Sequence, residues 1–121
     1  MHWTAVVIFA AVVILYLFVK RSDQVTAQDA QALVAGGALI VDVRTHGEFN
    51  AGHLPGAINL PVDHIEATLA AQVRDKNDKI LVYCQSGFRS RVAKRTLTAL
   101  GYTQVFNLGS YQRAVRILKR G

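Results

Sequence analysis

The sequence of 121 residues contains one cysteine, Cys84, so no internal disulfide, CxxC redox pair or multi-cysteine zinc site can form. Any thiol chemistry therefore uses a single sulfur atom. Histidine is also scarce, and His2, His46 and His64 show no metal-binding spacing with one another or with Cys84. Phosphate-binding glycine loops and dinucleotide fingerprints are missing as well, so no metal and no cofactor are predicted.

Acidic residues are few, because eight Asp and Glu stand against fourteen Lys and Arg, for a net charge of +6. The basic residues are scattered and lack an aromatic-rich basic face, so no nucleic-acid partner is predicted. An anionic leaflet or an anionic substrate explains the charge equally well. Two basic groups leave nucleic-acid or lipid-surface binding open as a less favoured role, although such runs are usually solvated helix faces: Arg91, Lys94 and Arg95, and Arg116, Lys119 and Arg120.

Charged side chains are absent from residues 3–19, WTAVVIFAAVVILYLFV. A helix over this segment rises about 25 Å, close to the roughly 30 Å hydrocarbon core, and the following Lys20 and Arg21 can extend to the headgroups. A cleaved signal peptide would place basic residues before the apolar run and a small-residue cleavage site after it, which is not the order seen here. We therefore expect residues 1–21 to form an uncleaved transmembrane helix with a basic flank. A buried core helix is the weaker alternative, because the segment is apolar all round.

The basic residues also predict the orientation of this span. All fourteen Lys and Arg lie at or beyond position 20, and the positive-inside rule then places the C-terminal part in the cytoplasm. The expected location is the cell inner membrane, crossed once and contacting lipid through residues 3–19. Insertion with the domain on the far side remains the alternative.

Residues 22–121 are predicted to form one α/β domain, because apolar runs of strand length alternate with helical patterns. A mainly parallel central sheet flanked by helices is the expected architecture. The expected strands are 38–43, 57–60, 79–84 and 104–108, with an abbreviated one at 24–25. The expected helices are 27–35, one from Asp63 to about Val73, 90–100 and 111–119, with a short turn over 47–51.

The stretch CQSGFRS at 84–90 follows a buried strand and precedes a helix. Ligands of parallel α/β sheets bind at the carboxyl ends of strands, and the amides of a helix N-terminus attract anions. Arg89 and this helix end would stabilise a Cys84 thiolate, while Gly87 lets consecutive N–H groups converge on one anion. The loop is interpreted as an anion cradle around sulfur. The alternative is a cysteine that only packs beneath the sheet.

Three motifs in this order resemble the rhodanese family in its single-domain form: VDVR at 41–44, HGEFNAGHLPGAINLP at 46–61 and VYCQSGFRS at 82–90. The resemblance implies a sulfurtransferase in which Cys84 attacks a sulfur donor and holds the sulfur as a persulfide. A thiol or cyanide then removes that sulfur. Related phosphatases have five residues between cysteine and arginine, whereas four separate Cys84 from Arg89, which favours sulfur over phosphate.

The same resemblance implies roles for the residues around the cysteine. Backbone amides from Gln85 to Arg89 would cradle the persulfide, and side chains would shape the pocket mouth. The residues that the resemblance assigns to substrate binding are Gln85, Ser86, Gly87, Phe88 and Arg89, and those that support the loop are Asp42 and Arg44. For Asp42 and Arg44, a surface ion pair is the competing interpretation.

Further positions are compared with the family pattern. Glu48 and His53 match it, and His53 is interpreted as a structural hydrogen-bonding residue. Ser110 stands where the family usually has a second glycine, and the following Tyr111 would take part of the place of an aromatic. This departure bears on the choice of substrate more than on the cysteine chemistry.

The expected partners are a small sulfur-containing anion, such as thiosulfate, and a thiol or cyanide acceptor. The N-terminal helix also favours an alternative function, a membrane-tethered sulfur-carrier or binding module with little turnover of small molecules. Such a module would work with a membrane or sulfur-relay protein.

Overall fold

The computed structural model describes residues 2–118, without the side chains of residues 20–22. The side chains of Lys20 and Arg21, which were predicted to reach the headgroups, therefore lie outside the described part of the chain. The terminal residues Lys119 and Arg120 lie outside it as well.

A sheet of four strands forms the centre of the domain. The strands are β1 (Leu39–Asp42), β2 (Ile58–Asn59), β3 (Ile80–Cys84) and β4 (Val105–Ser110). Their order is β2-β1-β3-β4 and every pairing is parallel, which confirms the predicted α/β fold. All of β3 is buried, since both faces of this central strand are covered. The expected strand at 24–25 is reduced to one bridge between Gln24 and Asn107.

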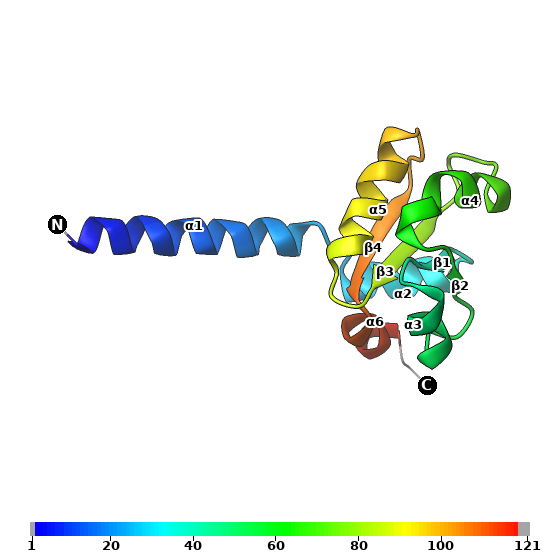
Figure 1. Ribbon diagram of the computed structural model, residues 1–121, viewed down its shortest axis with the longest axis horizontal. Helices are drawn as coiled ribbons and strands as arrows, with labels where there is room; N and C mark the ends of the chain where they lie inside the picture. Colours follow the sequence, from blue (N-terminus) through cyan, green and yellow to red (C-terminus); the bar gives the residue numbers. More distant parts are fainter. Residues whose placement is uncertain (1, 119–121) are drawn as a thin grey trace.

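Helices cover both faces of the sheet (Figure 1). On one face lie α4 (Ile65–Gln72) and α5 (Phe88–Ala99), which bury Leu69 and Leu97 against the strands. On the other lie α2 (Ala27–Ala35) and α6 (Tyr111–Leu118), which bury Ala30 and Ile117. Two short elements, α3 (His46–Ala51) and the 3-10 turn η1 (Val62–His64), connect the strands on the carboxyl side of β1 and β2.

Several element boundaries differ from the predicted ones for local reasons. The expected turn over 47–51 is the helix α3, because Thr45 and Glu48 form a capping box at its start. Helix α5 begins at Phe88 rather than at 90, since Gly87 already adopts the left-handed conformation that turns the chain into the helix. Strand β2 has two residues rather than four, because only Ile58 and Asn59 pair with β1.

The N-terminal helix α1 (His2–Ser22) extends away from the domain (Figure 1). Its side chains from residue 2 to 19 are all exposed, and by length and composition the segment His2–Val19 can cross a membrane. The helix ends at Ser22, one residue beyond the predicted span of residues 1–21. Asp23 and Gln24 then lead directly into the domain.

Candidate active site around Cys84

Cys84 is the last residue of β3, and its side chain is fully buried. The backbone N–H of Gly87 donates to Cys84 Sγ at 3.0 Å. The thiol itself lies 3.6 Å from Ser90 Oγ, and the Ser90 hydroxyl donates to the carbonyl of Gly87 at 3.1 Å. The sulfur is thus enclosed by the loop that follows it and by the first turn of α5.

Gly87 makes this enclosure possible. Its φ of 96° lies in the left-handed region, where a side chain would be strained. This conformation points the Gly87 N–H at the sulfur and starts α5, whose N-terminus carries a partial positive charge. The site therefore offers a hydrogen bond and a helix dipole to a negatively charged sulfur.

The mouth of the loop is formed by Gln85, Ser86 and Phe88, which are exposed, while Arg89 is partly buried. Ser86 also bridges to Ser110 at the end of β4, and Gln85 Oε1 accepts a hydrogen bond from Arg44 Nη1 at 3.0 Å. The loop is therefore held from two neighbouring strands. A substrate would reach the sulfur between these exposed side chains.

Asp42 and Arg44 form a buried ion pair with 2.7 Å between Arg44 Nη2 and Asp42 Oδ2. Their side chains are 0% and 3% exposed, which rules out the surface pair considered from the sequence. Arg44 also donates to the carbonyl of Gly52 at 2.7 Å, and its hydrogen bonds with Asp42 raise the pKa of its guanidinium. Because the same guanidinium holds Gln85, the pair connects the end of β1 to the cysteine loop.

Aromatic rings enclose the other sides of Arg44. Its guanidinium carbon lies 4.5 Å from the ring centre of Tyr111 and 5.6 Å from that of Tyr83. The two rings stack on each other with 5.8 Å between their centres. Tyr111 therefore forms, together with Tyr83, an aromatic wall around the Arg44 guanidinium.

A second ion pair joins α3 to α5. Arg89 donates to both carboxylate oxygens of Glu48, at 2.7 and 2.9 Å. These hydrogen bonds lower the pKa of Glu48 to about 2 and raise the pKa of Arg89. The positive charge of Arg89, which was expected to stabilise the Cys84 thiolate, is thus already paired, and a donor anion would meet Arg89 together with Glu48.

The structure brings together every residue that the sequence nominated for the site, and adds two. Ser90 was missed because a serine in the first turn of a helix has no distinctive pattern. Glu48 matched the family motif, but its contact with Arg89 joins positions 41 residues apart and leaves no local signal. His53 Nδ1 lies 2.9 Å from the carbonyl oxygen of Phe49, so its ring is placed for the hydrogen-bonding role predicted for it.

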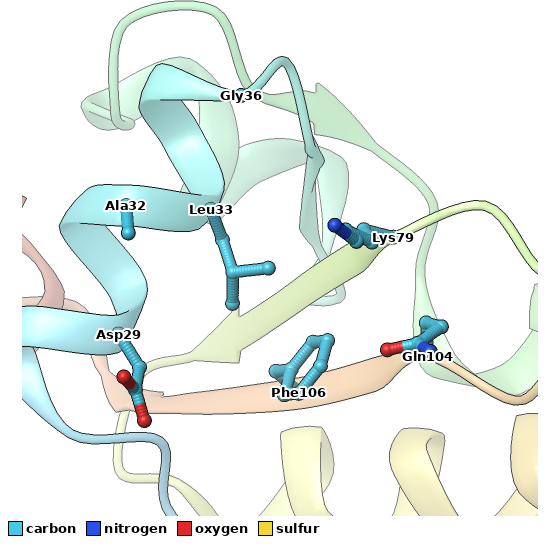
Figure 2. A pocket seen from close by; sticks show the side chains of 7 residues that line it. All are labelled: Asp29, Ala32, Leu33, Gly36, Lys79, Gln104 and Phe106. Carbon is cyan, nitrogen blue, oxygen red and sulfur yellow. The ribbon is translucent and has the colours of Figure 1, made fainter.

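Grooves of the domain also lie away from Cys84. Figure 2 shows one of about 350 Å³ between α2 and β4, where Leu33 and Phe106 point toward the space. Lys79 and Gln104 mark it as the amino end of the strands, opposite Cys84. Among residues 2–118, no cluster of three or more His, Cys, Asp or Glu side chains is placed to hold a metal ion.

Comparisons with known proteins agree with this geometry. The model of the rhodanese-like domain matches residues 26–115. The chain is 42% identical over 69 residues to thiosulfate sulfurtransferase PspE of Escherichia coli, a match that covers 57% of this chain and 66% of that protein. It is 36% identical over 69 residues to the putative sulfur carrier protein YrkF of Bacillus subtilis, covering 57% of this chain and 36% of that one. The human single-domain sulfurtransferase TSTD1 has a similar structure, with a TM-score of 0.67 and 30% identity over 82% of this chain and 98% of that one.

Proposed function

The chain belongs to the rhodanese-like domain family, and on that premise we propose that it is a sulfurtransferase that carries sulfur as a persulfide on Cys84. One observation supports this most directly. The sulfur of Cys84 lies at the carboxyl end of a parallel strand and accepts the Gly87 N–H at 3.0 Å, at the start of a helix. This environment favours the thiolate that attacks a sulfur donor.

With thiosulfate as the donor, the Cys84 thiolate attacks the outer sulfur atom. A new S–S bond forms at Cys84, the S–S bond of thiosulfate breaks, and its electron pair leaves with sulfite. Cyanide or a thiolate then attacks the outer sulfur of the persulfide, and the departing electron pair regenerates the Cys84 thiolate. No oxidant or reductant is consumed in either step.

The surrounding residues would serve these steps in different ways. The amides from Gln85 to Arg89 stabilise the charge on the outer sulfur, while Gln85, Ser86 and Phe88 shape the entrance. Arg89 meets the anionic donor. Asp42 and Arg44 are positioning residues, because Arg44 reaches the loop through its hydrogen bond to Gln85.

Intact mass spectrometry of the full chain in detergent tests the proposal. The protein is reduced, desalted and treated with thiosulfate, beside Cys84→Ser. We expect a gain of one sulfur atom in the unmutated chain alone, reversed by cyanide. An equal gain in Cys84→Ser would refute the role of Cys84, and no gain in either chain would reject thiosulfate as the donor.

A sulfur carrier that hands sulfur to a membrane or relay protein is the second candidate. The similarity to a putative sulfur carrier protein and the long apolar helix favour it. Loading of one sulfur without steady-state thiocyanate production would indicate the carrier. Continuous turnover of thiosulfate and cyanide would indicate the enzyme.

We also propose that residues 1–21 form a single-pass anchor in the inner membrane, and that residues 22–121 form the cytoplasmic domain. The apolar helix α1, whose side chains from residue 2 to 19 are all exposed, supports a span, and the distribution of Lys and Arg supports the orientation. Resistance to alkaline carbonate extraction tests the span. Protection of the domain from protease added to intact spheroplasts tests the orientation, and cleavage there would place the domain outside.

A further inference from the structure

The end of α1 and the start of α5 share one cavity of about 110 Å³. Tyr16 of α1 lines it together with Phe88 and Arg91 of α5. Tyr16 precedes the end of α1 at Ser22 by about 9 Å along the helix axis, at 1.5 Å per residue. If α1 spans a bilayer through residues 3–19, Tyr16 lies in the last turn of the span, next to the interfacial region where tyrosine is enriched, and the start of α5 lies beside it.

Hydrogen bonds and an ion pair attach the residues that follow α1 to the domain. Asn107 Nδ2 donates to Asp23 Oδ2 at 2.9 Å, and the N–H of Val25 donates to the carbonyl of Asn107 at 2.9 Å. Lys94 of α5 adds an ion pair with Asp23 at 3.7 Å. Figure 1 shows α5 on the side of the domain that faces α1, running roughly crosswise to it, with α4 on the far side.

The outer face of α5 has the composition of a membrane-surface helix. Phe88, Arg91, Val92 and Arg95 follow the spacing of one helix face, and we call these four residues the docking surface. Phe88 is 62% exposed and Val92 39%. Helix α5 contains no acidic residue, and the structure records no ion pair for Arg91 or Arg95 among residues 23–118.

We propose that the docking surface binds anionic phospholipid headgroups of the bilayer that α1 spans. The inference rests on the proposed span. Arg91 and Arg95 match the negative charge of such a leaflet, and each basic side chain near it strengthens binding roughly fivefold. Phe88 and Val92 reach the boundary between headgroups and acyl chains, as apolar side chains of interfacial helices do.

Docking in this way would orient the active site. Phe88 belongs both to the docking surface and to the mouth of the cysteine loop, so the entrance to Cys84 opens beside the headgroups. A donor or acceptor thiol held at the membrane surface would then reach the sulfur without leaving the interface.

Fluorescence of the full chain in lipid nanodiscs tests the docking. Trp3→Phe removes the one tryptophan of the sequence, and Val92→Trp then reports from the docking surface. Ala70→Trp, on the exposed face of α4, is the matched control far from α1. The discs contain phosphatidylcholine alone or an equal mixture with phosphatidylglycerol, and part of the lipid is brominated near the headgroup end of the chains.

We expect stronger quenching of the Val92→Trp reporter than of the control, with a further increase in the anionic discs. Adding Arg91→Glu and Arg95→Glu should lower the equilibrium constant for docking by on the order of 25-fold or more, because two attractive charges become repulsive. At 1 M salt, where screening acts beyond about 3 Å, the effect of the anionic lipid should also fall.

The outcomes separate this inference from the proposed span. A chain that stays in the membrane after alkaline washing, but whose two reporters are quenched equally, refutes the docking alone. A chain that alkaline washing extracts refutes the span, and the docking with it. Sulfur loading of Cys84 is measured separately, so neither result depends on the proposed sulfur transfer.

Discussion

At the scale of single residues, the sulfur of Cys84 has few polar contacts, so each of them should affect its reactivity. Cys84 Sγ has the Gly87 N–H and the Ser90 hydroxyl as its polar contacts. The Ser90 hydroxyl donates to the Gly87 carbonyl while the thiol is protonated. Once the proton leaves, rotation of this hydroxyl would supply a second donor to the thiolate. Ser90 is thus expected to stabilise the Cys84 thiolate by a hydrogen bond, although Ser90 is buried and not part of the mouth of the site.

Replacing Ser90 by alanine tests this role. We expect Ser90→Ala to slow alkylation of Cys84 by iodoacetamide and its loading with sulfur about fivefold, because one hydrogen bond is worth about 1 kcal/mol. Thr98→Ala, which removes an exposed hydroxyl from the same helix, should leave both rates unchanged. Ser90→Thr keeps a hydroxyl and should restore part of the rate. Equal rates in Ser90→Ala and the native chain would show that Ser90 only packs.

The residue scale also shows what sequence can reveal about such a site. Cys84 and Gly87 were predictable, because a lone cysteine and a glycine between a strand and a helix form a local pattern. The buried state of Arg44 was not, since an Asp-x-Arg motif looks the same on a surface. Its burial depends on Tyr83 and Tyr111, which come from two other elements and were not linked to it by any spacing.

At the scale of elements, the carboxyl end of β1 supports the loop that follows β3. Arg44 links Asp42 of β1 to Gln85 through three hydrogen bonds to the carboxylate and one to the amide. The two strands are neighbours in the sheet, so this side-chain link lies next to the backbone pairing of Asp42 with Tyr83. The position of the end of β1 therefore determines where Gln85, at the mouth of the cysteine loop, is held.

Removing one charge of this buried pair should be costly. Asp42→Asn leaves the Arg44 guanidinium buried without a counter-ion, and we expect the free energy of unfolding to fall by about 3–5 kcal/mol. Asp29→Asn, an exposed carboxylate on α2, should change it by less than about 0.5 kcal/mol. Urea unfolding in mild detergent, followed by the near-ultraviolet circular dichroism of the tyrosines, measures both. A loss no larger than that of the control would contradict a structural role for the pair.

The bridge between α3 and α5 predicts a pH dependence. Arg89 lowers the pKa of Glu48 from 4.5 to about 2, so the bridge stabilises the folded chain fully above pH 4.5 and loses this effect as the pH falls toward 2. Because both side chains are about one-third exposed, we expect Glu48→Gln to cost about 1 kcal/mol at neutral pH. This difference should shrink between pH 4.5 and 2.

The same unfolding measurement at several pH values checks the prediction, with Glu66→Gln as a control on the exposed part of α4. A Glu48→Gln difference that stays constant down to pH 2 would mean that the carboxylate is not responsible. The capping box joins Thr45 to Glu48 three positions away, whereas only the fold brings Glu48 to Arg89.

Elements were predicted more accurately by type than by extent. Hydrophobic runs of strand length identified the four strands, and their alternation with helices implied the parallel sheet. The length of β2 could not be inferred, because it depends on how far the chain stays beside β1. The start of α5 also depends on backbone geometry at Gly87, which the helical pattern of the following residues does not contain.

At the scale of the whole molecule, the chain consists of an apolar helix and a domain that are joined by very few residues. The sequence indicated both parts and their order. It indicated a short strand at 24–25, but not that Asp23 would contact Asn107 of β4, because that contact joins positions 84 residues apart. Asn107 lies at the centre of this junction, and its side chain is buried.

Asn107 also connects the junction to the cysteine loop. Its Oδ1 accepts the N–H of Gly109 at 2.8 Å, and Gly109 and Ser110 pair with Tyr83 and Cys84 on β3. Removing the side chain takes away the hydrogen bond to Asp23, which keeps its ion pair with Lys94, and leaves the buried Gly109 N–H without its partner, at a cost of about 1–3 kcal/mol. A structural change at the end of α1 should therefore also change the backbone next to Cys84.

We expect Asn107→Ala in nanodiscs to speed amide hydrogen exchange both at residues 23–25 and in the loop 85–89. Asn77→Ala is the matched control, because its side chain accepts a hydrogen bond from Thr103 in an exposed turn at the opposite end of the sheet. Faster exchange at 23–25 alone would mean that the anchor is attached without influencing the active site. Faster exchange at both would mean that the position of the domain on the membrane and the shape of the cysteine loop depend on one buried amide.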